Sequence, residues 1–230
     1  MDIPWTQYNM ARLRLGLEAS VYPANIVHVT ELHDKQVFDT ICPLLVKICA
    51  FSRAGAPAGE FSGFQYSTSS NLIVSAAHMV GFSGLPPGSA PRAEVFKARY
   101  ADGFEEEVEV LNSAANQQPD IVILRGSRPA PCPLVGAHCN AGDTVYALGF
   151  SPHSTSPCFS KGIVSCSKIG SIAITAHTGN GYSGGPVVNI RGQLVGVIRG
   201  SLGAMVLQVD VTPAEHVHVL LLQSRQPGLG

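Results

Sequence analysis

The sequence predicts an all-β fold, and three observations support this prediction. Only 13% of the 230 residues are charged while 45% are hydrophobic, which is typical of a globular chain that buries a substantial core. The 24 glycines and 16 prolines are spread over many short segments, as expected for numerous strands joined by turns. Several apolar runs also have the length of strands and end at turn-forming residues.

Charge, hydropathy and the N-terminal residues limit the kinds of binding partner and the cellular compartment that we expect. The formal net charge is −1 without long blocks of like charge, so binding to nucleic acid or to a membrane surface has no electrostatic support. No apolar stretch approaches the roughly 18 residues that cross a bilayer. The first five residues lack the pattern of a signal peptide, and no Asn-x-Ser/Thr sequon occurs. We therefore expect an intracellular, cytoplasmic protein without nucleic-acid or membrane partners.

Six cysteines raise the question of disulfides or metal binding. No Cys-x-x-Cys pair is present, so zinc ligation is not indicated. Spacing alone does not decide any pairing among them. We expect mostly free, buried thiols in a reducing compartment. The six are Cys42, Cys49, Cys132, Cys139, Cys158 and Cys166.

Two apolar runs each carry one polar residue that could serve catalysis. Residues 71–78 form an apolar run that ends in small residues and then His78. Residues 117–124 place Asp120 at the start of another apolar run. Both runs are predicted to be buried strands, so each polar side chain would lie at a strand edge on a rigid scaffold.

A third motif is the glycine-rich segment 177–186, which contains Ser183 and leads into an apolar run. A serine in such a turn can present its hydroxyl to a substrate while neighbouring N–H groups bind a developing oxyanion. Taken singly, each residue has a commoner explanation: a surface or core histidine, an aspartate in a turn, a serine in a linker. Their occurrence together, in the order His78, Asp120, Ser183, predicts a catalytic triad.

These three motifs resemble those of the chymotrypsin-like serine proteases. They are most similar to the protease domain of the HtrA/Deg branch, without the PDZ domain. The resemblance covers roughly residues 38–224 and implies a two-lobed, chymotrypsin-like double β-barrel with a C-terminal helix. Weaker similarities lie at residues 42–48 (a first strand), 145–150, 162–165 and 192–197. The implied parts are an N-terminal extension at 1–37, a first barrel at about 38–129, a second barrel at about 134–210 and the C-terminal helix at about 213–223.

Smaller elements can be read between these parts. Residues 10–18 have partial helical character, and we expect the N-terminal extension to pack as a strap over the barrels. Residues 81–88 read as a surface loop, and 105–110 as part of a hairpin. The sequence Thr-Pro-Ala-Glu at 212–215 is a capping box with proline at the first helical position, which predicts the start of the C-terminal helix.

The resemblance also implies roles for residues of the site. His78 would take the proton of Ser183, and Asp120 would orient the imidazole. The backbone N–H groups of Gly181 and Ser183 would form the oxyanion hole, and no metal or organic cofactor is implied. Protein or peptide substrates would add as a strand along Ile198, Arg199, Gly200 and Ser201. A homo-oligomer is possible, because trimers are common in the HtrA branch.

Two departures from the family bear on activation and specificity. Tyr182 stands where trypsin-like zymogens have aspartate and HtrA-like enzymes have asparagine, so activation by zymogen cleavage is not expected. The resemblance places His177 and Thr178 at the base of the specificity pocket and Ile198 on its wall, without the acidic residue that selects Lys or Arg. We expect a medium apolar residue to be preferred, with Glu or Gln second; Arg199 could attract an acidic side chain or point away.

The sequence is also compatible with two alternatives to an endopeptidase. The pattern Gly181-x-Ser183-x-Gly185 also matches the nucleophile elbow of α/β-hydrolase esterases. That fold requires a helix after the serine, whereas residues 186–190 read as a strand. The second alternative is a peptide-binding module of low activity on the same protease fold, in which Tyr182 or the N-terminal extension blocks the site.

Overall fold

The computed structural model describes residues 24–80, 93–113, 119–152, 154–201 and 208–224. The chain divides into two compact units, Met1–Val37 and Phe38–Gly230. The expected helical character at 10–18 and the expected surface loop at 81–88 lie outside the described residues.

The first described element is helix α2, Ala24–Ile41, which the sequence analysis did not predict. The sequence does contain a signal for it, because no glycine or proline interrupts these 18 residues. The helix gives way to a short 3₁₀ turn, η1 (Cys42–Leu44), with a proline in its first turn. For this reason strand β1 begins at Leu45, and the strand expected over residues 42–48 starts later than predicted.

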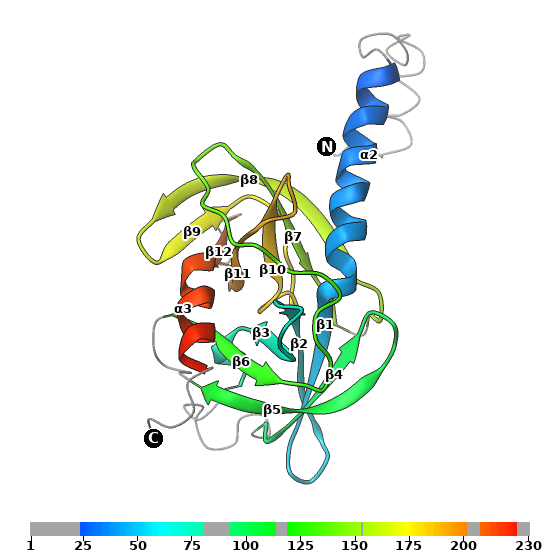
Figure 1. Ribbon diagram of the computed structural model, residues 1–230, viewed down its shortest axis with the longest axis vertical. Helices are drawn as coiled ribbons and strands as arrows, with labels where there is room; N and C mark the ends of the chain where they lie inside the picture. The colour runs from blue at the N-terminus through cyan, green and yellow to red at the C-terminus, as the bar shows by residue number, and fades with distance from the viewer. Residues whose placement is uncertain (1–23, 81–92, 114–118, 153, 202–207, 225–230) are drawn as a thin grey trace, which may run out of the picture. The chain divides into compact units, whose positions relative to one another are not determined.

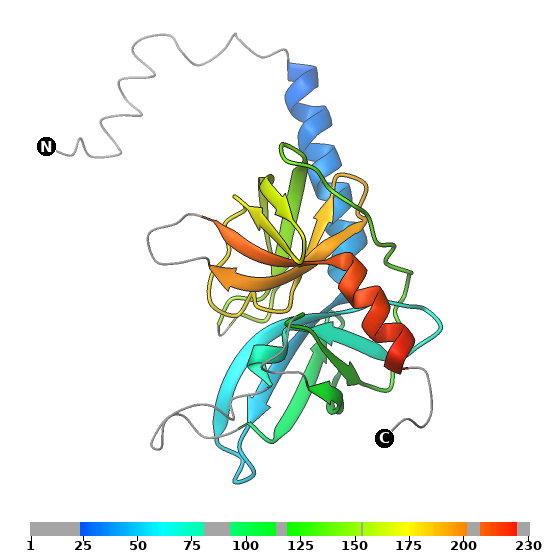
Figure 2. The same ribbon diagram turned by 90° about the vertical axis from the view of Figure 1, so that its left-hand side faces the viewer.

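The first barrel is a closed antiparallel sheet with the strand order β1-β2-β3-β6-β5-β4 (Figures 1 and 2). Along β1, Val46, Ile48 and Ala50 are buried in the barrel core, and the alternate side chains point the other way. Both apolar runs that carry the predicted site residues contribute strands to this barrel. The strands are β1 (Leu45–Phe51), β2 (Pro57–Gln65), β3 (Leu72–Ser75), β4 (Val95–Tyr100), β5 (Glu105–Ser113) and β6 (Val122–Arg125).

The second barrel is likewise closed and antiparallel, with the strand order β10-β11-β12-β9-β8-β7. Its core is built from aliphatic side chains together with Tyr182. The predicted all-β double barrel is therefore confirmed. The strands are β7 (Thr144–Gly149), β8 (Cys158–Lys168), β9 (Ser171–Ile174), β10 (Pro186–Asn189), β11 (Leu194–Ser201) and β12 (Val209–Pro213).

The predicted C-terminal helix is also confirmed, as α3 (Ala214–Ser224). The capping box predicted for its start is wrong. Thr212 belongs to strand β12, where it pairs with Val197 of β11. Its side-chain oxygen is buried and has no hydrogen-bond partner among the described residues, so it does not cap the helix.

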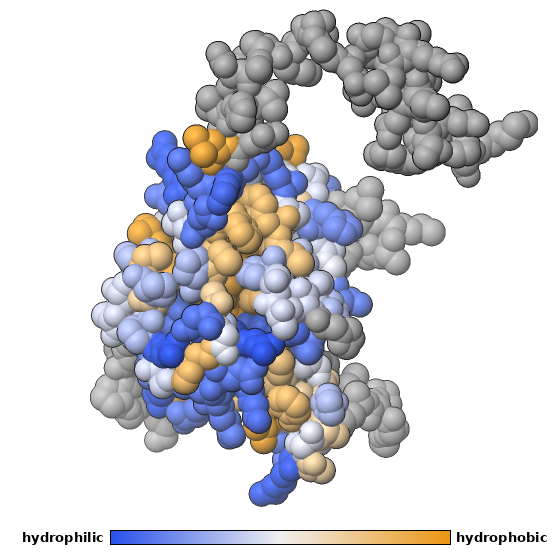
Figure 3. Space-filling view, turned by 90° about the vertical axis from the view of Figure 1, so that its right-hand side faces the viewer, coloured by the Kyte–Doolittle hydropathy of each residue, from blue (hydrophilic) through white to orange (hydrophobic). Residues whose placement is uncertain are grey.

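The surface of the described residues exposes few large apolar side chains. On the face shown in Figure 3, hydrophilic residues lie between the apolar areas. In the described part of the chain, no helix has the length and apolar character that crossing a bilayer requires. The exposed large apolar residues are Leu32, Phe104, Val135, Ile163, Ile169, Ile190, Val219 and Leu222.

Candidate active site

Strand pairing brings His78 and Asp120 together, although 42 residues separate them. His78 lies in a short 3₁₀ turn just after β3, and Asp120 lies just before β6. These strands are antiparallel neighbours, with Ser75 opposite Val122. The end of one such strand lies beside the start of the other, so the two polar side chains meet at one end of the first barrel.

The Asp120 carboxylate accepts two hydrogen bonds from His78. Its Oδ1 accepts from the main-chain N–H at 2.7 Å, and its Oδ2 lies 2.6 Å from Nδ1 of the ring. An ionised carboxylate can only accept, so Nδ1 donates and Nε2 of a neutral ring is left as an acceptor. The His78 side chain is 39% exposed and Asp120 14%, so the ring is accessible while its partner is sheltered. The pair is suited to work as a general base.

Electrostatics keep the Asp120 carboxyl ionised. Burial raises the pKa of this carboxyl. The hydrogen bonds from His78, the charge of His78 and the charge of the Arg199 guanidinium all lower it, and together they outweigh the effect of burial. The result is a pKa below the ordinary value for aspartate. Asp120 is therefore negatively charged at neutral pH and can hold the imidazole in one tautomer.

Ser183 lies in the loop between β9 and β10, and two glycines give this loop its shape. Gly181 and Gly184 have φ angles of +87° and +86°, which other residues rarely adopt. A Cβ atom at Gly184 would approach the Ser62 carbonyl oxygen and the Ser75 hydroxyl to 2.2 Å. The glycines that drew attention to this segment are thus required both by backbone conformation and by close packing on the first barrel.

The Ser183 hydroxyl donates a 3.2 Å hydrogen bond to the main-chain carbonyl of Arg199. Among the described residues it makes no hydrogen bond to His78. Nucleophile and base are therefore both present in the same compact unit but are not engaged with each other. Catalytic hydrogen bonds are often long or misaligned before substrate binds, so this geometry is compatible with catalysis.

The two N–H groups predicted to form the oxyanion hole are available. Within the described part of the chain, the main-chain N–H groups of Gly181 and Ser183 have no protein acceptor. The surrounding loop is tied down by its neighbours: Gly184 N–H donates to the Ile198 carbonyl at 2.8 Å, and Gly185 N–H donates to the Tyr182 carbonyl at 2.8 Å. Free donors in an otherwise bonded loop are what an anionic intermediate requires.

Ser62 of β2 is a residue that the sequence analysis missed. Its hydroxyl donates to the Gly181 carbonyl at 2.7 Å and accepts from Phe150 N–H at 2.8 Å. Its own N–H donates to the Ser183 carbonyl at 3.0 Å. Ser62 therefore holds the carbonyls of the two residues whose N–H groups are free. In the sequence this serine lies between Phe61 and Gly63, and that context carries no signal for the contact.

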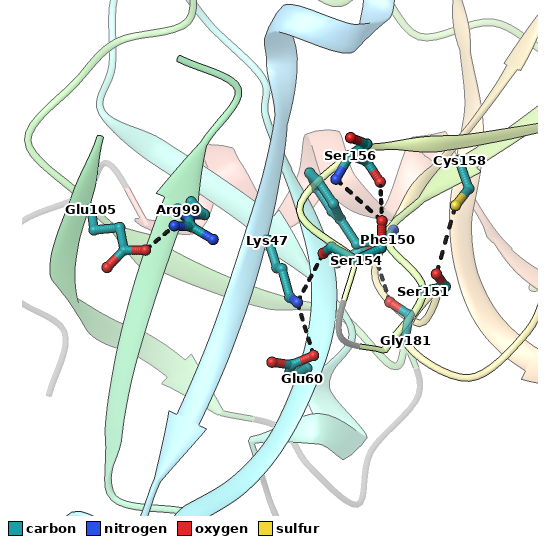
Figure 4. Close-up of polar contacts among 11 residues, drawn as sticks. Lys47, Glu60, Arg99, Glu105, Phe150, Ser151, Ser154, Ser156, Cys158 and Gly181 are labelled. Carbon is teal, nitrogen blue, oxygen red and sulfur yellow. Dashed lines mark hydrogen bonds and ion pairs between the residues drawn. The ribbon is translucent and has the colours of Figure 1, made fainter. Parts of the chain in front are cut away.

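A buried lysine supports the same side of the site (Figure 4). Lys47 of β1 is only 5% exposed and forms an ion pair with Glu60 at 2.8 Å. It also donates to the Ser154 carbonyl at 3.0 Å, in the loop that follows β7. Because this loop contains Phe150, the first barrel holds it at two points, through Ser62 and through Lys47.

Tyr182, which precedes Ser183, is buried in the core of the second barrel and is 8% exposed. Burial, followed by its interaction with Cys158, raises its pKa well above the ordinary tyrosine value. The side chain thus anchors the serine loop in the core of the second barrel, so it does not cover Ser183. The expected block of the site by Tyr182, part of the binding-module alternative, has no support in this placement.

The residues predicted to bind substrate lie in different surroundings. His177 is exposed, and its carbonyl accepts a hydrogen bond from Ser160. Thr178 is half-buried, whereas Ile198 is buried with the core of the second barrel. On the side of β11 that faces β10, Ile198 is already bonded: its N–H donates to the Gly185 carbonyl at 2.9 Å and its carbonyl accepts from Gly184 N–H at 2.8 Å. Ile198 is therefore not free to pair with a substrate strand as predicted, whereas residues 199–201 have no described strand partner on that side.

Arg199 does not extend towards a free substrate site. Its guanidinium pairs with Asp210 at 2.9 Å and lies 3.8 Å from Asp120. The sequence left open whether this side chain attracts an acidic substrate or points away from the site. In the structure it interacts with two carboxylates of the protein itself. A role for this side chain in attracting an acidic substrate is therefore not supported.

A hollow of about 430 Å³ has Ser183 in its wall and is lined by residues of β2 and of the serine loop. A larger hollow of about 500 Å³ lies elsewhere, near the start of α3, and none of the predicted triad residues lines it. We assign the chemistry to the smaller one because it contains the candidate nucleophile. It is lined by Pro57, Gly59, Glu60, Met79, Pro152, Asn180, Gly181 and Ser183.

All six cysteines are free thiols, in agreement with the sequence analysis, although they are half-buried and not fully buried. Burial, together with nearby carboxylates, raises the pKa of Cys42, Cys49 and Cys139. Within the residues described, no group of three or more His, Cys, Asp or Glu side chains is arranged to hold a metal ion.

The esterase alternative is excluded by the fold. Strand β10 begins at Pro186, three residues after Ser183, where the α/β-hydrolase elbow requires a helix. The surrounding architecture is also two antiparallel barrels and not a sheet covered by helices.

Comparison with known proteins agrees with the fold and the motifs. Residues 61–197 match the trypsin-like peptidase domain. Serine protease HTRA3 of Rattus norvegicus and of Mus musculus are each 27% identical over 180 residues, covering 70% of this chain and 38% of the relative. HTRA3 of Homo sapiens gives the same identity and coverage. The chain thus spans well under half of the length of these relatives.

A solved structure supports the architecture independently. The crystal structure of the serine endoprotease from Yersinia pestis superposes with a TM-score of 0.68 at 20% identity, covering 83% of this chain and 66% of that chain. At this identity the likeness bears on the fold alone. The match of residues 61–197 covers more than half of the chain. This protein therefore belongs to the family of trypsin-like peptidase domains.

Proposed function

We propose that this protein is a serine endopeptidase that hydrolyses peptide bonds in protein substrates. The observation that carries the proposal is the 2.6 Å contact between Nδ1 of His78 and the Asp120 carboxylate, in the same compact unit as Ser183 and two unused N–H groups. These are the three functions that acyl transfer requires: an oriented base, a nucleophile and preformed anion donors.

In the first half of the reaction, Nε2 of His78 takes the proton of the Ser183 hydroxyl as its oxygen attacks the peptide carbonyl. The carbonyl oxygen becomes an anion and accepts hydrogen bonds from the N–H groups of Gly181 and Ser183. Asp120 stabilises the resulting imidazolium, and the ring then gives its proton to the departing amine. The C–N bond breaks, and the substrate acyl group remains as an ester on Ser183.

In the second half, water takes the place of the amine. His78 removes a proton from the water as its oxygen attacks the ester carbonyl, and the same N–H groups hold the second oxyanion. The ester bond breaks, the Ser183 oxygen regains a proton from His78 and the carboxylic acid leaves. The free enzyme is restored without any redox change or co-reactant.

For substrate binding, we propose that a peptide adds to the free edge of β11 at Gly200 and Ser201. Thr178 is half-buried, and the residues predicted for the specificity pocket (His177, Thr178 and Ile198) include no acidic side chain. This favours a medium apolar side chain next to the cleaved bond, with Glu or Gln second. Profiling with a peptide library tests this specificity, and strong cleavage after Arg would contradict it.

We further propose that the enzyme works inside the cell and needs no cleavage for activation. Six free thiols are suited to a reducing compartment. Tyr182 provides buried anchoring where zymogens use a charged residue, so the serine loop is supported without a newly released N-terminus.

One observation favours the second candidate, a peptide-binding module of low activity. The Ser183 hydroxyl bonds to the Arg199 carbonyl and not to His78. If this arrangement persisted with substrate bound, the nucleophile would stay unactivated. The free edge of β11 could still hold a peptide.

Reaction with a fluorophosphonate probe separates the two candidates. We expect labelling of the wild-type protein that is lost in Ser183→Ala and strongly reduced in His78→Ala, together with cleavage of an unfolded protein substrate. A folded wild-type sample that neither reacts nor cleaves, but binds peptides, would favour the binding module. Circular dichroism of each variant checks that loss of labelling is not loss of fold.

A further inference from the structure

Arg199 is the bulged residue of strand β11. Pairing with β12 runs from Gly196 to Ile198, then shifts so that Gly200 lies opposite Asp210. A bulge places two residues opposite one and redirects a side chain that regular alternation would aim elsewhere. The side chain of Arg199 therefore does not follow the regular alternation of β11, and its ion pairs show its direction.

The redirected guanidinium lies between two carboxylates from different barrels. Its Nη1 lies 2.9 Å from the carboxylate of Asp210 in β12, and its Nε lies 3.8 Å from Oδ2 of Asp120. All three side chains are mostly buried, with Arg199 24% exposed. Asp210 is itself held by the Ser171 hydroxyl at 2.6 Å. Solvent screens such a partly enclosed group of charges less than it screens surface pairs.

Arg199 also contacts the third member of the triad through its main chain. Its carbonyl accepts the hydrogen bond of the Ser183 hydroxyl, while its side chain faces Oδ2 of Asp120, the oxygen that the His78 ring contacts. One residue thus touches both ends of the proposed triad. The charged groups that act on the Asp120 carboxyl are the His78 ring and the Arg199 guanidinium, and Arg199 in turn faces Asp120 and Asp210.

We propose that Arg199 is a positioning residue that links Asp210 to the Asp120–His78 pair and sets the pH at which the base becomes competent. This inference rests on the proposed function. The positive guanidinium offsets part of the Asp120 charge, so it makes a protonated imidazole less favourable. Asp210 in turn offsets part of the guanidinium charge. Removing Arg199 and removing Asp210 must therefore have opposite effects.

The test measures the rate of fluorophosphonate labelling from pH 4.5 to 8 in wild type and variants. In Arg199→Gln we expect the midpoint of the acidic limb to rise by about half a pH unit, as for a partly screened charge a few ångströms away. In Asp210→Asn we expect it to fall, and in Arg199→Lys to stay within about 0.2 pH unit of wild type, because the charge is retained. Arg125→Gln serves as the matched control, since it also removes the positive member of an Arg–carboxylate pair, on the exposed surface.

The proposal would be overturned if the midpoint in Arg199→Gln equalled that of wild type. It would also be overturned if the midpoints of Arg199→Gln and Asp210→Asn shifted in the same direction. General loosening of the fold would lower rates without opposite shifts. An NMR titration of the His78 ring provides a second readout that does not need activity. A wild-type protein that fails to label contradicts the proposed function, whereas the titration still decides whether Arg199 and Asp210 act on His78 in opposite directions.

Discussion

The Ser62 hydroxyl donates a 2.7 Å hydrogen bond to the carbonyl of Gly181, so a strand of the first barrel holds a peptide of the serine loop in the second. The same serine holds the Ser183 carbonyl through its N–H at 3.0 Å. The N–H groups of Gly181 and Ser183 are those proposed to bind the oxyanion. Ser62 therefore holds both residues that carry the donors, through the carbonyls on the far side of each residue from its N–H.

Ser62→Ala should lower kcat by about tenfold to a hundredfold with little change in KM, because misaligned donors weaken binding of the transition state only. The hydrogen bonds to Gly181 and from Phe150 are both lost, while the N–H contact to Ser183 remains. Steady-state kinetics on a peptide substrate measure the two constants separately.

Ser75→Ala is the matched control for that variant. Ser75 is also fully buried, and its hydroxyl donates to the Ser62 carbonyl at 2.6 Å, so a similar bond is lost beside the same residue. Each variant should lower the free energy of unfolding by about 1–3 kcal/mol. Equal losses of kcat in both would mean that the site is loosened generally and that Ser62 has no specific role.

Gly184→Ala should abolish labelling of Ser183. The new Cβ would lie 2.2 Å from the Ser62 carbonyl oxygen at a φ of +86°, so the loop cannot keep both its conformation and its packing. Gly55→Ala separates these two effects, because Gly55 also has a positive φ but nothing within 4 Å of the new atom. We expect Gly55→Ala to lose about 1 kcal/mol of stability and no activity. Full labelling of Gly184→Ala would show that the close packing described for the loop is wrong.

Tyr182→Asn, which introduces the residue of HtrA-like enzymes, should lower the free energy of unfolding by about 3 kcal/mol. The ring is part of the core of the second barrel, and asparagine would leave both a cavity and a buried amide. Tyr182→Phe keeps the ring and should lose about 1 kcal/mol. Urea unfolding measures both values. Equal destabilisation by the two variants would assign the role to the hydroxyl and contradict anchoring by the ring.

Asp120 should make stability depend on pH. Its pKa is lowered in the folded protein, so its stabilisation is fully present above the ordinary aspartate pKa of about 3.9 and is lost as the pH falls through the lower folded-state value. Asp120→Asn should therefore show a flatter decline of unfolding free energy below about pH 5 than wild type. Parallel curves for the two proteins would mean that the ionised carboxylate gains nothing from its partners in the fold.

Several features of this protein could be predicted from short stretches of sequence. Apolar runs bounded by turn residues identify the strands around His78 and Asp120, because a buried strand is a local pattern. The glycines around Ser183 mark a backbone that other residues cannot adopt, and that too is local. Helix α2 also has a local signal, a run of 18 residues without glycine or proline.

Other features depend on residues that only the fold brings together. Ser62 and Gly181 are 119 residues apart, and nothing in either neighbourhood indicates their contact. The Thr212 hydroxyl could not cap α3 because pairing with Val197 holds it in β12. The direction of Arg199 is decided by a bulge in β11 and by two carboxylates from different barrels. Propensity and periodicity act over a few residues, so they predict the elements, whereas hydrogen bonds and ion pairs across the barrels are decided by closure of the sheets.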